Sequence, residues 1–156
     1  MSYQIMQDTN QLLFIAAFAV VFPLFWLAIV FLISRLSGWA SVARQYPADG
    51  PVAGERFHWC SARFRVFSNY SNCLTVTVAT TGVHVQPFVP FRIGHSPIFI
   101  PWTAVQEFRR SNYWITSAVL LKIRNRNGGW PTTVTLYGRR MAGSLEKSYE
   151  RGRTRT

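Results

Sequence analysis

The first feature of the hydropathy pattern is an apolar segment from Leu12 to Ile33 that contains no charged, amide or hydroxyl side chain. As a helix, these 22 residues would extend about 33 Å, enough to cross a hydrocarbon core of about 30 Å. Pro23 lies near the middle, and membrane helices tolerate proline, so we expect at most a kink there. The pattern therefore predicts one transmembrane helix over residues 12–33.

The flanks of this segment predict an uncleaved anchor of defined orientation. The preceding tail, residues 1–11, has no Lys or Arg, and no small-x-small cleavage site follows the segment closely, which is unlike a signal peptide. Arg35 and Arg44 lie just beyond the far end. The positive-inside rule then places the tail outside the membrane and residues 34–156 in the cytoplasm.

A juxtamembrane helix and a linker are predicted over residues 34–55. Four apolar residues recur at the spacing of one helical face: Trp39, Val42, Ala43 and Tyr46. We expect about two turns ended by Pro47. In one interpretation this helix lies among lipid headgroups, with Trp39 inserted and Arg35 and Arg44 on phosphates. The alternative is that the same face packs against the domain that follows.

From residue 56 the pattern changes to alternation, which is typical of β-strands. Strands are predicted over 57–66, 74–78, 83–86, 98–102, 113–123 and 132–137, with a turn at Asn69–Asn72 between the first two. About seven short antiparallel strands indicate a small barrel or sandwich over residues 56–149, which would end in a short helix over 141–149. Residues 150–156 form a basic tail that we expect to be frayed.

Two stretches, Ser37–Pro47 and Phe91–Trp102, resemble small uncharacterised bacterial single-pass membrane proteins. In addition, the order of a strand, a Thr81-Gly82 turn, a second strand and then Ile100-Pro101-Trp102 is similar to bacterial pleckstrin-homology-like (PH-like) and GRAM-like domains. The resemblance covers roughly residues 37–140. It implies two near-orthogonal antiparallel sheets capped by a C-terminal helix, and lipid or protein binding at a membrane without chemistry of its own.

One departure from that family limits what the resemblance implies. Members that read phosphoinositides carry a basic cluster in the first hairpin, where this chain has only Arg63 and Arg65. Headgroup specificity therefore does not follow from the resemblance.

The charge of the chain is strongly basic, with 17 Lys and Arg against 6 Asp and Glu and a net charge of +11. Near a membrane, each surface Lys or Arg attracts anionic lipid with about 1 kcal/mol. Contacts to a headgroup or a partner are expected from four residues: Arg92, His95, Arg109 and Arg110. The alternatives are a solvated basic face and nucleic-acid binding. Strand alternation places Phe64 on the opposite face from Arg63 and Arg65, which disfavours a surface for stacking bases.

Candidate chemistry is sparse. His58 and Cys60 share a strand face, but no spacing supplies four zinc ligands, and no nucleophile elbow or glycine-rich phosphate loop is present. Cys60 and Cys73 are expected to stay unpaired, because a hairpin at Asn69–Asn72 would place Cys60 opposite residue 79. We therefore predict neither a metal nor a cofactor.

Together these patterns predict a non-enzymatic binding module anchored in the bacterial inner membrane. Its partners would be anionic lipids, a membrane protein complex that it serves as an accessory or scaffold subunit, or both. A membrane-anchored enzyme with an unrecognised site is the alternative from a different class.

Overall fold

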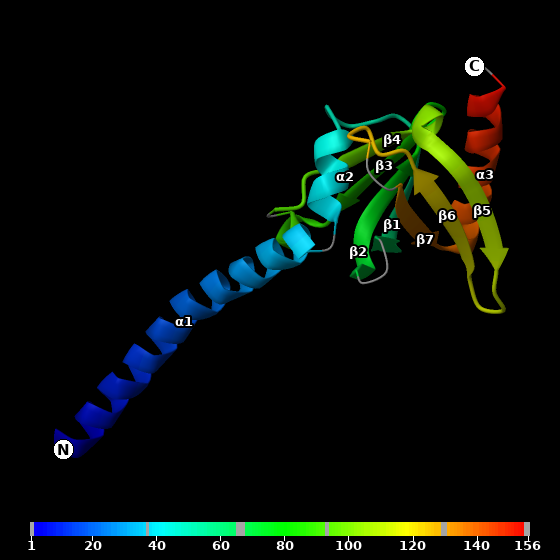
Figure 1. Ribbon diagram of the computed structural model, residues 1–156. Coiled ribbons are helices and arrows are strands. Elements are labelled where there is room, and N and C mark those ends of the chain that lie inside the picture. Colours follow the sequence, from blue (N-terminus) through cyan, green and yellow to red (C-terminus); the bar gives the residue numbers. More distant parts are fainter. Residues whose placement is uncertain (1, 37, 65–67, 93, 129–130, 155–156) are drawn as a thin grey trace.

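The computed structural model describes residues 2–36, 38–64, 68–92, 94–128 and 131–154, apart from the side chains of residues 2–9, 33–36 and 90. A long N-terminal helix leads into a β domain that is flanked by two further helices (Figure 1). This confirms the predicted fold class: an apolar N-terminal helix, seven antiparallel strands and a C-terminal helix.

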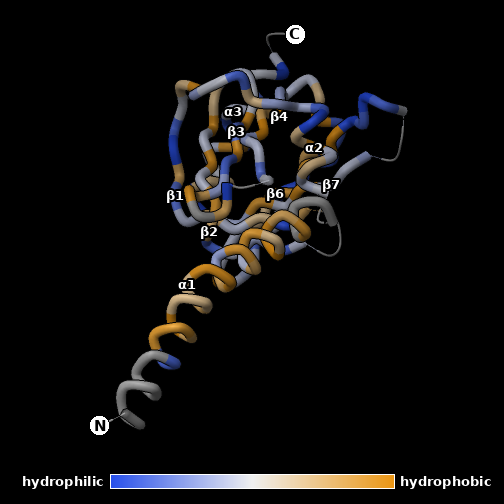
Figure 2. Tube along the Cα trace, turned by 90° about the vertical axis from the view of Figure 1, so that its left-hand side faces the viewer, coloured by the Kyte–Doolittle hydropathy of each residue, from blue (hydrophilic) through white to orange (hydrophobic). Residues whose placement is uncertain are grey.

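Helix α1 (Ser2–Leu36) runs without interruption through Pro23, as predicted. Its segment Asn10–Leu32 has a mean hydropathy of 2.7 and is long and apolar enough to cross a membrane. A signal sequence near the N-terminus meets the same two criteria, whereas a core helix does not fit, because only 6% of the most apolar window is buried. Figure 2 shows the hydrophobic colour along this part of the helix.

The C-terminal part of α1 lies against the β domain. Val30 is 4% exposed, and the ring of Trp26 is 6.3 Å from that of Phe91. The chain then turns at Gly38, whose φ of 80° lies in the left-handed region that glycine adopts without strain. This turn directs helix α2 (Trp39–Gln45) back onto the domain.

The apolar face of α2 is part of the core. Trp39, Val42, Ala43 and Tyr46 are all buried, and the helix ends before Pro47 as predicted. The interpretation that placed Trp39 among lipid headgroups is wrong, because its indole is 0% exposed; the alternative, packing on the domain, is confirmed.

Seven antiparallel strands form one curled sheet in the order β4-β3-β2-β1-β7-β6-β5. The strands are β1 (Glu55–Phe64), β2 (Ser68–Val78), β3 (Gly82–Pro87), β4 (Ile98–Pro101), β5 (Val105–Asn112), β6 (Ser117–Ile123) and β7 (Thr132–Tyr137). Two short 3-10 helices, η1 (Val89–Phe91) and η2 (Trp102–Ala104), flank β4. The sheet curls into a half-barrel with α2 on one side and the C-terminal helix α3 (Arg139–Arg153) on the other (Figure 1).

Both helices close the half-barrel with apolar side chains. The inner face of the sheet is aliphatic, with Val76, Val85 and Leu121 fully buried. On the side of α3, Tyr149 stacks on Phe108 with ring centroids 4.7 Å apart. The core therefore extends from α2 through the sheet to α3.

Three predicted boundaries are wrong. The run predicted as one strand over 113–123 contains the turn between β5 and β6, and β5 itself was missed. The predicted turn Asn69–Asn72 belongs to β2, where Asn69 pairs with Arg63 and a bulge places Asn72 at a φ of 52°. The C-terminal helix continues to Arg153, so most of the expected frayed tail is helical.

Candidate anion-binding site

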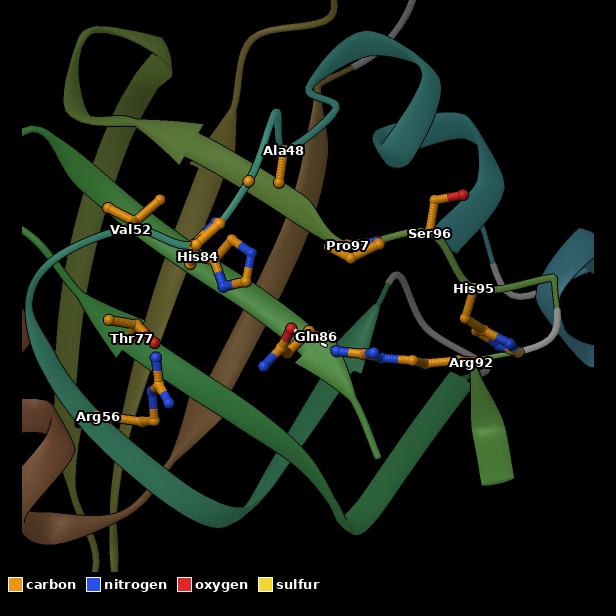
Figure 3. A pocket seen from close by; sticks show the side chains of 12 residues that line it. Ala48, Val52, Arg56, Thr77, His84, Gln86, Arg92, His95, Ser96 and Pro97 are labelled. Carbon is orange, nitrogen blue, oxygen red and sulfur yellow. Dashed lines mark hydrogen bonds between the residues drawn. The ribbon is translucent and has the colours of Figure 1, made fainter. Parts of the chain in front are cut away.

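A cavity of about 580 Å³ lies on the outer face of β1, β2 and β3, beneath the segment from Ala48 to Val52 (Figure 3). Its polar lining consists of Arg56, Thr77, His84, Gln86, Arg92 and His95. The segment Ser96–Pro97 completes one wall.

Strand register brings the first three of these side chains together. Arg56 of β1 pairs with Thr77 of β2, which pairs with His84 of β3. Paired residues in an antiparallel sheet project to the same face, so the three form a row across the outer surface. His84 is only 4% exposed although it points away from the aliphatic core, because the chain segment above the cavity covers it.

Arg92 enters the cavity from the opposite side. It follows η1, and its Nη2 donates a 2.9 Å hydrogen bond to Oε1 of Gln86 on β3. Figure 3 shows the guanidinium groups of Arg56 and Arg92 directed toward the space below His84 from two sides. The two cationic groups thus face a shared volume.

The charge of this cavity is not balanced within the described part of the chain. There, the ion pairs are Arg109–Glu107, Arg110–Glu146 and Lys122–Glu107, and none involves Arg56 or Arg92. Burial lowers the pKa of His84, and the positive charges of Arg56 and Arg92 lower it further. His84 is therefore neutral, and the positive charge of the two guanidinium groups favours an anion as ligand.

The side chain of His95 forms part of the cavity wall, and a hydrogen bond holds it in place. It is 2% exposed, and its Nε2 shares a 2.9 Å hydrogen bond with the hydroxyl of Tyr70. Trp39 lies against the same wall: its ring is 5.5 Å from that of His95, and its Nε1 donates a 2.8 Å hydrogen bond to the carbonyl of Ser96. Trp39 therefore supports the anion site from within the core.

The remaining predicted contact residues lie elsewhere. Arg109 and Arg110 are on β5, at the other edge of the sheet from β4, and both form ion pairs within the protein. Arg44 is exposed on α2. The side chain of Arg35 lies outside the described residues. Of the four predicted headgroup or partner contacts, only Arg92 and His95 come together.

Four polar lining residues, Arg56, Thr77, His84 and Gln86, were not predicted as site residues. Arg56 was at the border of the predicted linker, and His84 and Gln86 were predicted only as part of a strand. The alternation of the sequence did contain one indication of the site, because His84 and Gln86 are two residues apart on one strand and so project to the same face. Which strands lie beside them depends on long-range pairing, which that alternation does not specify.

The described residues contain no group of three or more His, Cys, Asp or Glu side chains that would hold a metal ion. Cys60 and Cys73 are free thiols, and burial raises the pKa of each, so both favour the protonated form. The register that we predicted for Cys60 is wrong: it pairs with Leu74, next to Cys73, because β2 begins at Ser68.

Neither a scan of protein-family models nor a search of curated proteins finds a match to this chain.

Proposed function

We propose that this protein is a single-pass, non-enzymatic membrane protein whose β domain binds the anionic headgroup of a lipid at the bilayer surface. The observation that carries the proposal is the cavity that Arg56 and Arg92 both line without an acidic partner among the described residues. The apolar segment Asn10–Leu32 supports the anchor, and its contact with the domain at Phe91 supports a position near the bilayer for Arg92.

The ligand chemistry follows from the lining. Guanidinium groups bind phosphate oxygens through paired, charge-assisted hydrogen bonds, and the hydroxyl of Thr77 and the amide of Gln86 add neutral partners. We propose a phosphate-containing headgroup as the ligand, in keeping with the resemblance over residues 37–140.

The proposed topology has the N-terminus outside and the β domain in the cytoplasm of a bacterial inner membrane. It rests on the flanking charges, since residues 1–11 lack Lys and Arg while Arg35 and Arg44 follow the span. Reporter fusions at both termini test the orientation, and N-terminal sequencing of the mature protein tests for cleavage of α1.

Ligand binding is tested on the full chain in zwitterionic detergent. The titrants are short-chain phosphatidylglycerol, short-chain phosphatidylcholine and inorganic phosphate, with chemical shifts or thermophoresis as the readout. We expect saturable binding of phosphatidylglycerol, and its loss in Arg56→Gln and in Arg92→Gln. Arg109→Gln is the matched control, because Arg109 is 70% exposed and lies on another strand.

The titrations distinguish a lipid headgroup from a soluble phosphate compound as the source of the anion. Equal affinity for inorganic phosphate would indicate a soluble phosphate compound as the ligand instead of a lipid. Unchanged phosphatidylglycerol binding in both arginine variants would refute this cavity as the site.

A second candidate function, an accessory subunit of a membrane protein complex, is favoured by the turn between β5 and β6. Trp114 and Ile115 at this turn are 99% and 92% exposed, and the turn lies on the side of the β domain opposite α1 (Figure 1). Exposed aromatic side chains of this kind act as anchors in protein interfaces. A complex that copurifies with the chain and is lost in Trp114→Ser would support this role.

A further inference from the structure

Apolar side chains lead from the membrane segment onto the surface of the β domain through two ring contacts that the backbone of η1 joins. The ring of Trp26 in α1 lies 6.3 Å from that of Phe91, the last residue of η1. The backbone N–H of Phe91 donates to the carbonyl of Phe88, and the ring of Phe88 lies 4.6 Å from that of Trp59 on β1. We name Trp59, Phe88, Val89 and Phe91 the apolar rim.

Two residues of the apolar rim are exposed where a soluble domain would be expected to bury or avoid such residues. Trp59 is 70% exposed and Val89 is 74% exposed. Trp59 also adopts a φ of 57° at a bulge in β1, a left-handed conformation that is strained for a non-glycine residue. The backbone thus turns a large indole outward at an energetic cost.

The position of Trp26 within the span determines the depth of the apolar rim. Trp26 precedes Leu32, the end of the apolar segment, by six residues, which is about 9 Å along a helix. Because Phe91 contacts Trp26, a bilayer that covers the segment to Leu32 also reaches η1.

We propose that the apolar rim is a second membrane contact, inserted below the headgroup layer of the bilayer that α1 spans. This inference rests on the proposed function, since it requires α1 to span. The bilayer is the occupant because the apolar rim is continuous with the span through the Trp26–Phe91 contact. Arg92 follows Phe91 directly, so insertion of η1 holds the mouth of the anion site in the headgroup layer.

The test places an environment-sensitive fluorophore on single cysteines in the full chain, reconstituted in lipid nanodiscs. The label positions are Val89→Cys in η1, Ile115→Cys in the turn between β5 and β6, and Phe18→Cys in α1. Ile115 is the matched control, because it is a β-branched residue that is 92% exposed and remote from α1 in Figure 1. All variants carry Cys60→Ala and Cys73→Ser, so that neither of the two native free thiols is labelled.

Quenching by iodide in water and by lipids spin-labelled near the headgroup is measured at each position. We expect the label at residue 89 to show several-fold weaker iodide quenching than the label at residue 115, together with strong quenching by lipid. The label at residue 18 should resist iodide, and it reports whether α1 is in the bilayer at all.

Each other outcome overturns a defined claim. A label at residue 89 that is as accessible to iodide as that at residue 115, with residue 18 shielded, refutes the membrane contact and leaves the span intact. A residue 18 label that iodide reaches refutes the span and the inference together. Shielding of residue 89 without quenching by lipid would indicate a second copy or a partner protein on the apolar rim instead of the bilayer.

Discussion

The hydroxyl of Tyr46 donates a 2.7 Å hydrogen bond to the carbonyl of Arg124, which lies 78 residues further along the chain. This bond joins the end of α2 to the segment after β6. Beside it, the guanidinium of Arg126 lies 4.7 Å from the Tyr46 ring centroid. The backbone carbonyl of Tyr46 also accepts from the N–H of Phe99 on β4. The juxtamembrane segment is therefore part of the β domain.

A first prediction concerns where the folded domain begins. A fragment of residues 38–156 should unfold cooperatively, whereas a fragment that starts at Arg56 should not. The shorter fragment lacks α2 and would expose Phe64 and Tyr70, which pack on Trp39 at centroid distances of 4.7 and 5.3 Å. Thermal denaturation followed by near-ultraviolet circular dichroism distinguishes the two. A cooperative transition in the shorter fragment would contradict the proposed boundary.

The second prediction uses two tryptophans with opposite environments. Trp39→Ala should lower the free energy of unfolding by about 3–5 kcal/mol, because a fully buried indole and its hydrogen bond to Ser96 are lost. Trp114→Ala removes an indole that is 99% exposed and should change stability by less than about 0.5 kcal/mol. Urea titration of both variants gives the comparison. Similar values for the two would show that α2 does not pack as described.

The third prediction is a loss of stability at acidic pH that originates at His84. Burial and the charges of Arg56 and Arg92 lower the pKa of His84 in the folded protein. The unfolded chain, with an ordinary pKa of about 6.5, therefore takes up a proton first as the pH falls. The contribution of His84 to stability is full above about pH 6.5 and is lost as the pH falls toward the lower folded pKa.

Urea midpoints between pH 8 and pH 5 measure this effect. His84→Gln should flatten the pH dependence, while His58→Gln, at an exposed position of β1, is the control. A bound anion favours protonated His84, so saturating phosphatidylglycerol should reduce the loss at low pH. An unchanged slope in His84→Gln would exclude His84 as its source.

The fourth prediction separates Arg110 from the anion site. Its Nη1 lies 2.5 Å from Oε2 of Glu146, which ties β5 to α3 at a partly exposed position. Arg110→Ala should cost about 0.2–1 kcal/mol of stability and leave the affinity for phosphatidylglycerol unchanged. Thermal denaturation and the lipid titration are run on the same preparation. Weaker binding of phosphatidylglycerol by this variant would show that Arg110 contributes to the anion site.

A fifth prediction tests the extent of α3 with two glycines of that helix. A Cβ at Gly152 would lie 2.5 Å from the ring of Trp102, whereas a Cβ at Gly143 meets no atom within 4 Å. Gly143→Ala should stabilise the protein by up to about 1 kcal/mol through helix propensity. Gly152→Ala should destabilise it, because the Trp102 ring must move. Equal shifts in melting temperature would indicate that the end of α3 is not docked.

The elements that were predicted correctly are those with a strong local pattern. The apolar run, the stripe led by Trp39 and the alternation around Val76 and Val85 each specify an element from neighbouring residues alone. The turn between β5 and β6 was missed because Tyr113–Ile115 are β-prone residues in an exposed turn, where tertiary pairing outweighs propensity.

The site was less accessible to sequence reasoning for the same reason. Arg92 was identified from charge and resemblance, but its partners across the cavity come from β1 and β3. The row of Arg56, Thr77 and His84 forms only when β1, β2 and β3 pair in the observed register. A bulge near Trp59 and another near Asn72 shift that register, and alternation does not reveal either.

The attachment of α2 on both sides has a mechanical consequence. Pro47 bridges to Ile98, Tyr46 bonds to Arg124, and Val30 of α1 is itself buried. Because these contacts join α2 and part of α1 to the β domain, we expect torque applied to the long helix to be transmitted to the sheet. In a bilayer, a change in thickness that tilts the helix would rotate the entire β domain, and with it the anion site, relative to the lipid plane.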